Sequence, residues 1–122
     1  MIEVSDERFQ ELIDQALGEL PGEHAKNIKN VAIIYAEVPS DEQRIKLELR
    51  HDQTLLGLYE GRPLSQRQGM THLFPDKITL FKLPLASQTS NEIELKEAIK
   101  HTLWHEIAHY YGLDHAQIAE LE

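Results

Sequence analysis

The residues best suited to chemistry lie near the C-terminal end of the chain, where His105, Glu106 and His109 follow one another at helical spacing. In a helix, residues four apart lie about 40° apart around the axis and one turn along it, so both imidazoles can reach one metal ion. The intervening glutamate is offset by about 100° from the first histidine, beside the metal rather than on it. We therefore expect His105 and His109 to bind zinc, and Glu106 to accept a proton from a metal-activated water as general base.

A third ligand is expected just beyond this helix, because a catalytic zinc usually has three protein ligands and one open position. His115, six residues after His109, is the expected ligand. Gly112 lies between them, and a left-handed turn there, which a Cβ would oppose, can bring the following residues back over the helix end. Asp114 competes as a ligand or accepts a hydrogen bond from a ligand imidazole, and Glu120 is a more remote candidate. The chain has no cysteine, which excludes thiolate ligands and disulfides.

The bulk composition is that of an acidic globular protein. Of its 122 residues, 41% are hydrophobic and 27% are charged, which suits one domain over residues 1–122. The formal net charge of −9 argues against a nucleic-acid partner, because a polyanion would be repelled. The first residues do not resemble a signal peptide, and no apolar run is long enough to cross a bilayer. We therefore expect a cytoplasmic protein that does not bind membranes.

Apolar spacing predicts a helix towards each end of the chain. Ser5 is suited to cap a helix whose apolar residues recur from Phe9 to Leu20. The helix that carries the candidate site is predicted from about Asn91 to Tyr111, with Asn91 and Thr89 as alternative N-caps. A short helix over 116–121 is expected to follow it.

Between the two main helices the sequence predicts a small sheet. Short apolar runs bounded by turn residues indicate strands at 31–35, 55–59 and 77–83, the last stopped by Pro84. Residues 40–53 alternate partly like a strand, but a capping box formed by Ser40 and Gln43 favours a short helix there. The order of elements predicts an α+β fold, in which a small mixed sheet packs on the N-terminal helix and on the C-terminal helix that carries the candidate site.

The pattern His-Glu-x-x-His-x-x-Gly-x-x-His, from His105 to His115, resembles the signature of the metzincin zinc peptidases. More of the chain is similar to the bacterial minimal zincin-like metallopeptidases, which are small single-domain proteins. That similarity covers most of the sequence and includes the helix ending at Leu20-Pro21, the strand start at Asn30-Val31, and the segments Leu55–Gly61, Pro75–Phe81 and His105–Leu113.

The resemblance implies a zincin-like fold and a metallopeptidase that acts on peptides or unfolded proteins, with His105 and His109 as zinc ligands and Glu106 as catalytic base. In the smaller family the position of His115 is often Asp, and either residue can bind zinc. Metzincins also have a methionine-containing turn after the third histidine, whereas no methionine follows His115 here. Zincin topology further implies that an extended substrate pairs with an edge strand beside the helix, for which 78–83 is the candidate.

Two other functions compete with peptide hydrolysis. The Gly112-x-Asp114-His115 segment after a histidine pair also resembles the site of bacterial ribosomal-RNA maturation endoribonucleases. In those enzymes the residue after the first histidine is typically Gly, whereas here it is Glu106, and the chain's acidity disfavours RNA. The second alternative is a zinc-stabilised binding or regulatory module with negligible catalysis, because so small a domain has little room for a deep pocket.

Other residues of the C-terminal helix have plainer expected roles. His101, one turn before His105, is expected at the edge of a cleft. Tyr110 and Tyr111 are expected to pack near the helix end, although a phenol beside the metal could stabilise an oxyanion. Trp104 is expected to lie in the core or partly buried against the sheet.

Overall fold

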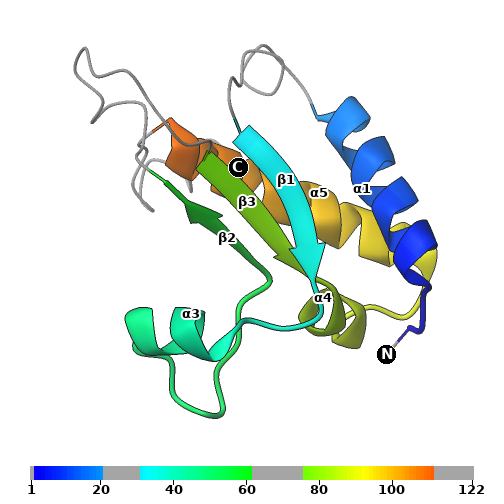
Figure 1. The fold of residues 1–122 in the computed structure, drawn as a ribbon. Helices are drawn as coiled ribbons and strands as arrows, with labels where there is room; N and C mark the ends of the chain where they lie inside the picture. The colour runs from blue at the N-terminus through cyan, green and yellow to red at the C-terminus, as the bar shows by residue number, and fades with distance from the viewer. Residues whose placement is uncertain (1, 21–30, 62–75, 112–122) are drawn as a thin grey trace.

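The computed structural model of this chain describes residues 2–20, 31–61 and 76–111. Its elements are, in order, α1 (Asp6–Glu19), β1 (Val31–Ala36), α3 (Asp41–Lys46), β2 (Gly57–Glu60), β3 (Asp76–Phe81), α4 (Lys82–Ser87) and α5 (Glu92–Tyr110). The two long helices, α1 and α5, lie side by side against one face of a small sheet (Figure 1). The predicted α+β fold is therefore confirmed. No helix in these ranges is long and apolar enough to cross a membrane.

Both long helices begin where a polar side chain caps them. The Ser5 hydroxyl accepts a hydrogen bond from the Arg8 N–H at 3.1 Å, which starts α1 as predicted. At the start of α5 the Asn91 side chain accepts from the Glu94 N–H at 2.9 Å. Asn91 is therefore the N-cap, and Thr89 instead bonds through its hydroxyl to the carbonyls at the end of α4.

The sheet is mixed, and β3 is its central strand. The order is β1-β3-β2, with β1 parallel and β2 antiparallel to β3. The expectation that 78–83 forms an edge strand for substrate is therefore wrong. The burial of β3 agrees with this central position: Ile78 and Leu80 are fully buried against the helices, and Thr79 between them is buried on the opposite face.

The chain leaves β3 earlier than its apolar run predicts. The expected strand through Leu83 ends at Phe81, and the helix α4 follows at once. Pro84 does not terminate a strand; it is the third residue of α4. Proline is tolerated there because the first four amides of a helix have no intrahelical acceptor. The expected strand at 55–59 likewise begins only at Gly57.

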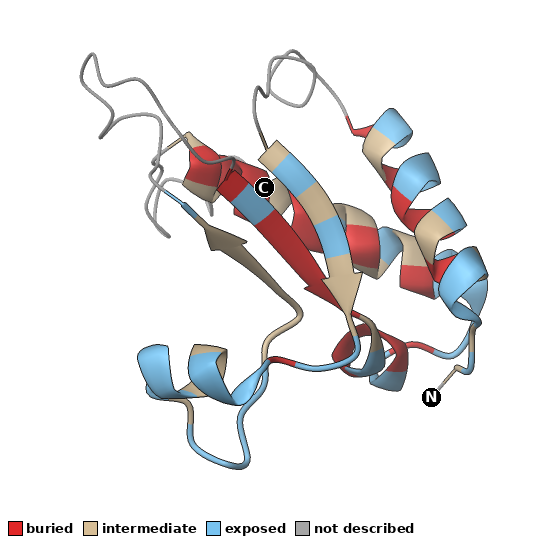
Figure 2. Ribbon diagram, in the orientation of Figure 1, coloured by how far each residue is buried: buried red, intermediate tan, exposed pale blue. Residues whose placement is uncertain are grey.

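The short helix α3 forms as its capping box predicts. The Ser40 hydroxyl accepts from the Gln43 N–H at 3.1 Å, and the Gln43 side chain accepts from the Ser40 N–H at 2.9 Å. None of its residues is buried, and Figure 2 shows α3 as largely exposed beside the sheet. α3 therefore contributes little to the core.

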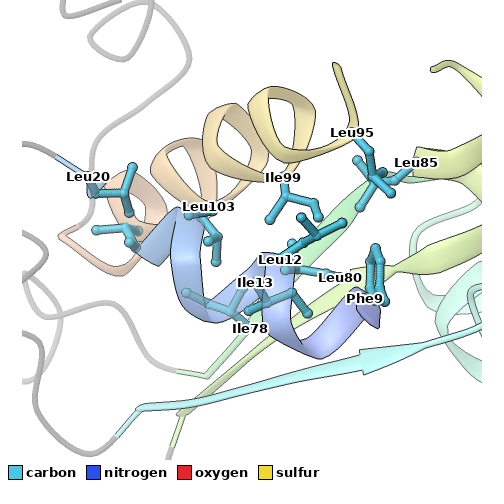
Figure 3. Close-up of a cluster of buried hydrophobic side chains, with 12 residues drawn as sticks. Phe9, Leu12, Ile13, Leu20, Ile78, Leu80, Leu85, Leu95, Ile99 and Leu103 are labelled. Carbon is cyan, nitrogen blue, oxygen red and sulfur yellow. The ribbon is translucent and has the colours of Figure 1, made fainter. Parts of the chain in front are cut away.

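The hydrophobic core lies between α1, α5 and the sheet (Figure 3). Leucine and isoleucine side chains of the two helices pack against Ile78 and Leu80 of β3, and Phe9, near the start of α1, belongs to the same cluster. Ion pairs join the two helices at their surfaces, from Arg8 to Glu92 and from Glu19 to Lys96 and Lys100. This packing fixes α5 against the sheet and so fixes the position of the candidate site.

Candidate metal centre

The C-terminal half of α5 brings His105, Glu106 and His109 together. The two imidazole rings have centroids 4.9 Å apart and planes at 71° to each other. Each of the three side chains offers one ligand atom, and these atoms lie within 4.8 Å of one another. Imidazole nitrogens and a carboxylate oxygen are the donors that zinc takes, so the three residues fit a zinc ion. The predicted grouping of the three side chains is therefore confirmed, whereas their separate roles stay predictions.

Glu106 is the buried member of this group, with 7% of its surface exposed. Its Oε1 accepts a hydrogen bond from the backbone N–H of Tyr59 at 2.8 Å. Burial raises the pKa of Glu106 to about 7, and the Tyr59 N–H opposes that rise by stabilising the carboxylate. A carboxyl group with such a pKa can both accept and release a proton near neutral pH, which is what a general base that later acts as an acid requires.

The site opens into a cleft of about 280 Å³ between α5 and the segment that leads into β2. Most of its lining surface is apolar, and the lining residues are Thr54, Leu55, Leu56, Gly57, His101, Thr102, His105 and Glu106. His101 is an exposed residue in this lining, which confirms its predicted place at a cleft edge. Two of the candidate metal-site residues, His105 and Glu106, therefore lie next to an apolar surface.

Gly57 is what allows β2 to lie this close to α5. A Cβ at this position would meet the Thr102 Cγ2 at 2.6 Å and the Thr79 carbonyl oxygen at 3.3 Å. Both distances are shorter than ordinary van der Waals contact, so any other residue would displace the strand, the helix or the Thr102 side chain. The glycine therefore helps to set the distance between β2 and Glu106.

Tyr59 is the residue of this site that the sequence analysis missed. It was expected only as part of a strand, whereas its backbone N–H binds Glu106. Because every residue except proline has such an N–H, no residue type or spacing could have indicated this contact. The aromatic residues of α5 do pack as expected: Tyr110 is buried, and Trp104 and Tyr111 are partly buried against the core.

The predicted third ligand lies outside the described residues. His115, the competing Asp114 and Glu120, the glycine turn at Gly112 and the short helix predicted over 116–121 all follow the last described residue. These expectations therefore stay predictions.

Fold and site together define an α+β protein with a candidate metal centre of two histidines and a glutamate on one helix. The family model described as zincin-like metallopeptidase matches residues 28–122, which include the whole sheet and α5. The chain belongs to this family, and the resemblance to minimal zincin-like metallopeptidases is confirmed. No curated protein matches the chain in sequence.

Proposed function

We propose that this protein is a zinc-dependent metallopeptidase in which His105, His109 and His115 hold the ion and Glu106 is the general base. The observation that carries the proposal is the position of Glu106. Its carboxyl group is buried beside two potential imidazole ligands and also lines an open cleft. A glutamate with a purely structural role would not be expected to lie both beside two imidazoles and in the lining of a cleft.

When bound, zinc would supply Lewis acidity, which lowers the pKa of a water molecule and polarises a carbonyl group. The residues of the chain supply the rest. Glu106 accepts the proton of the attacking water and passes it to the leaving amine, a role that its pKa of about 7 suits. Because the Tyr59 N–H binds Oε1, we assign the proton transfer to Oε2. The hydrogen bond to Oε1 limits rotation of the carboxylate during this transfer.

We propose peptides or unfolded proteins as substrates, bound along β2 instead of along the central strand β3. β2 is an edge of the described three-stranded sheet. Its Tyr59 N–H points away from β3 and towards α5, so this edge faces the candidate metal centre. Because Glu106 occupies the Tyr59 N–H, an extended peptide would add to this edge through other main-chain groups of β2 and place an apolar side chain in the adjoining cleft.

Glu106→Gln is the decisive variant. Glutamine keeps the size of the side chain and an oxygen that can accept the Tyr59 N–H, but it cannot act as a base at neutral pH. We expect the loss of cleavage of a labelled unfolded protein, with about one zinc per chain retained by metal analysis. Glu97→Gln on the same helix is the matched control, because Glu97 is exposed and pairs with Lys100.

The two competing functions give different results in the same assay. An endoribonuclease would cleave RNA and leave the unfolded protein intact. A zinc-stabilised binding module would bind zinc and cleave neither substrate, in wild type and variant alike. Cleavage of the unfolded protein at equal rates by wild type and Glu106→Gln would contradict the proposed role of Glu106.

A further inference from the structure

The proposed mechanism leaves one buried acid beside the site unexplained. Asp76, the first residue of β3, is fully buried. A buried carboxylate is costly unless hydrogen bonds replace its hydration. One donor is the Tyr59 hydroxyl, which bonds to Oδ2 of Asp76. The acid therefore fastens the side chain of the residue whose backbone binds Glu106.

The register of the sheet explains how these two residues meet. Tyr59 of β2 stands opposite Ile78 of β3, so Asp76 is the diagonal neighbour of Tyr59. Diagonal positions of an antiparallel pair are within reach of aromatic side chains. Asp76 and Ile78 lie two apart on the same face of β3, which is the face that packs on the helices.

Gly61 and Tyr110 lie beside this pair. A Cβ at Gly61 would come within 2.3 Å of the Asp76 carboxyl carbon, and its φ of +153° is one that other residues rarely adopt. The ring of Tyr110 meets that of Tyr59 edge-on, with centroids 6.2 Å apart. Tyr110 directly follows the potential ligand His109 on α5. Tyr59 is thus in contact with β3 through its hydroxyl and with α5 through its ring and its N–H.

We propose that Tyr59 and Asp76 are positioning residues for Glu106. The Asp76 carboxylate holds the Tyr59 hydroxyl, and the Tyr59 side chain so held keeps its own N–H directed at Oε1 of Glu106. Two hydrogen bonds, both made by Tyr59, thus link the edge strand β2 to the central strand β3 and to the helix α5. The catalytic consequence rests on the proposed function, whereas the positioning of the carboxylate does not.

The first test does not use activity and reads the hydrogen bond itself. The amide proton of residue 59 is followed by NMR in the wild type, Tyr59→Phe and Asp76→Asn, with Tyr35→Phe as control. Tyr35 lies on β1 and packs edge-on against Phe9, so this control removes a phenol hydroxyl elsewhere in the sheet. We expect amide exchange at residue 59 to be about tenfold faster in Tyr59→Phe and unchanged in Tyr35→Phe. Unchanged exchange in Tyr59→Phe would overturn the proposal.

The second test separates positioning from folding and from substrate binding. In zinc-loaded Tyr59→Phe we expect kcat to fall about 10- to 100-fold while KM stays within about twofold. We also expect the zinc content of the wild type. Asp76→Asn keeps an acceptor for the Tyr59 hydroxyl without the charge, so its loss of kcat should be smaller. A rise in KM alone, or an unchanged kcat in both variants, would overturn the proposal.

Two other outcomes are failure of Tyr59→Phe to fold and absence of peptidase activity in the wild type. If Tyr59→Phe does not fold, Asp76→Ala decides because it removes the acceptor of the Tyr59 hydroxyl, and wild-type amide exchange and kcat in that variant would overturn the proposal. If the wild type cleaves no peptide, the proposed function fails by itself. The amide exchange of residue 59 then still tests whether Tyr59 and Asp76 position Glu106.

Discussion

The backbone N–H of Tyr59 lies 2.8 Å from Oε1 of Glu106, and this hydrogen bond joins the edge strand β2 to the helix α5. A main-chain donor cannot change its rotamer, so it holds the carboxylate more firmly than a flexible side chain would. The same carboxyl group has a pKa raised to about 7 by burial. The contact with β2 therefore fixes the position of the carboxylate, whereas its burial raises the pKa against the opposing effect of the Tyr59 N–H.

Shortening this side chain tests the contact from the side of the acid. Glu106→Asp keeps the charge but withdraws the carboxylate by one methylene group, away from the Tyr59 N–H. We expect kcat to fall about 100-fold with zinc retained, because a displacement of about 1 Å at a catalytic group has an effect of this size. Steady-state kinetics with metal analysis measure both quantities. A kcat within a few fold of wild type would show that the contact does not matter for turnover.

Removing the histidines tests the metal centre. His105→Ala combined with His109→Ala should abolish stoichiometric zinc binding, whereas His101→Ala at the cleft edge should bind about one zinc per chain. Zinc should also raise the melting temperature of the wild type, because it binds the native state. Its loss on acidification is expected as the imidazoles protonate. Undiminished zinc in the double variant would contradict the assignment of this site.

A methyl group at Gly57 should push β2 away from α5. The Cβ of Gly57→Ala would lie 2.6 Å from the Thr102 Cγ2, so we expect a loss of about 1–3 kcal/mol in the free energy of unfolding. Adding Thr102→Ser removes that methyl group and should restore part of the loss. Urea denaturation of the single and double variants measures this coupling.

Gly18→Ala is the matched control for this experiment. Gly18 is also a glycine, but it lies within α1 and has no atom within 4 Å of the place where its Cβ would stand. Alanine should there stabilise the protein by about 0.5–1 kcal/mol, because it is the better helix former. Equal effects of the two substitutions would mean that the contact at Gly57 has no special cost.

The ion pairs of Glu19 should make stability depend on pH. Hydrogen bonds from Lys96 and Lys100 hold the pKa of Glu19 below its ordinary value of 4.5. A lowered pKa in the folded state stabilises the protein above the unfolded pKa, and this contribution is lost as the pH falls through the folded pKa. Glu19→Gln should therefore lower the melting temperature at pH 7 but have little effect at about pH 3.

Because Glu19 is exposed, the effect of this variant should be small and should shrink in high salt. Thermal melts of the wild type and Glu19→Gln at both pH values, with and without added salt, measure it. The same difference in melting temperature at pH 7 and at pH 3 would exclude the ion pairs as its cause.

The sequence by itself determined the features that depend on local geometry. The caps at Ser5 and Ser40 act on amides a few residues away, so their residue types predict where those helices begin, and for α5 they left only Asn91 and Thr89 as alternatives. The grouping of His105 and His109 follows from the helical repeat alone. Family membership was likewise predictable, because short motifs of the chain carry the resemblance.

Only the tertiary structure decided which strand is central, where β3 ends and what Glu106 contacts. Strand order depends on pairing between distant segments, and the apolar run 77–83 is compatible with either an edge or a centre. The bonds from Tyr59 to Glu106 and to Asp76 join residues 47 and 17 positions apart. The pKa of Glu106 depends on how completely these distant segments exclude water from its carboxyl group. The helical repeat thus brings the residues of the candidate site together, and tertiary packing sets the orientation of the Glu106 carboxylate and raises its pKa.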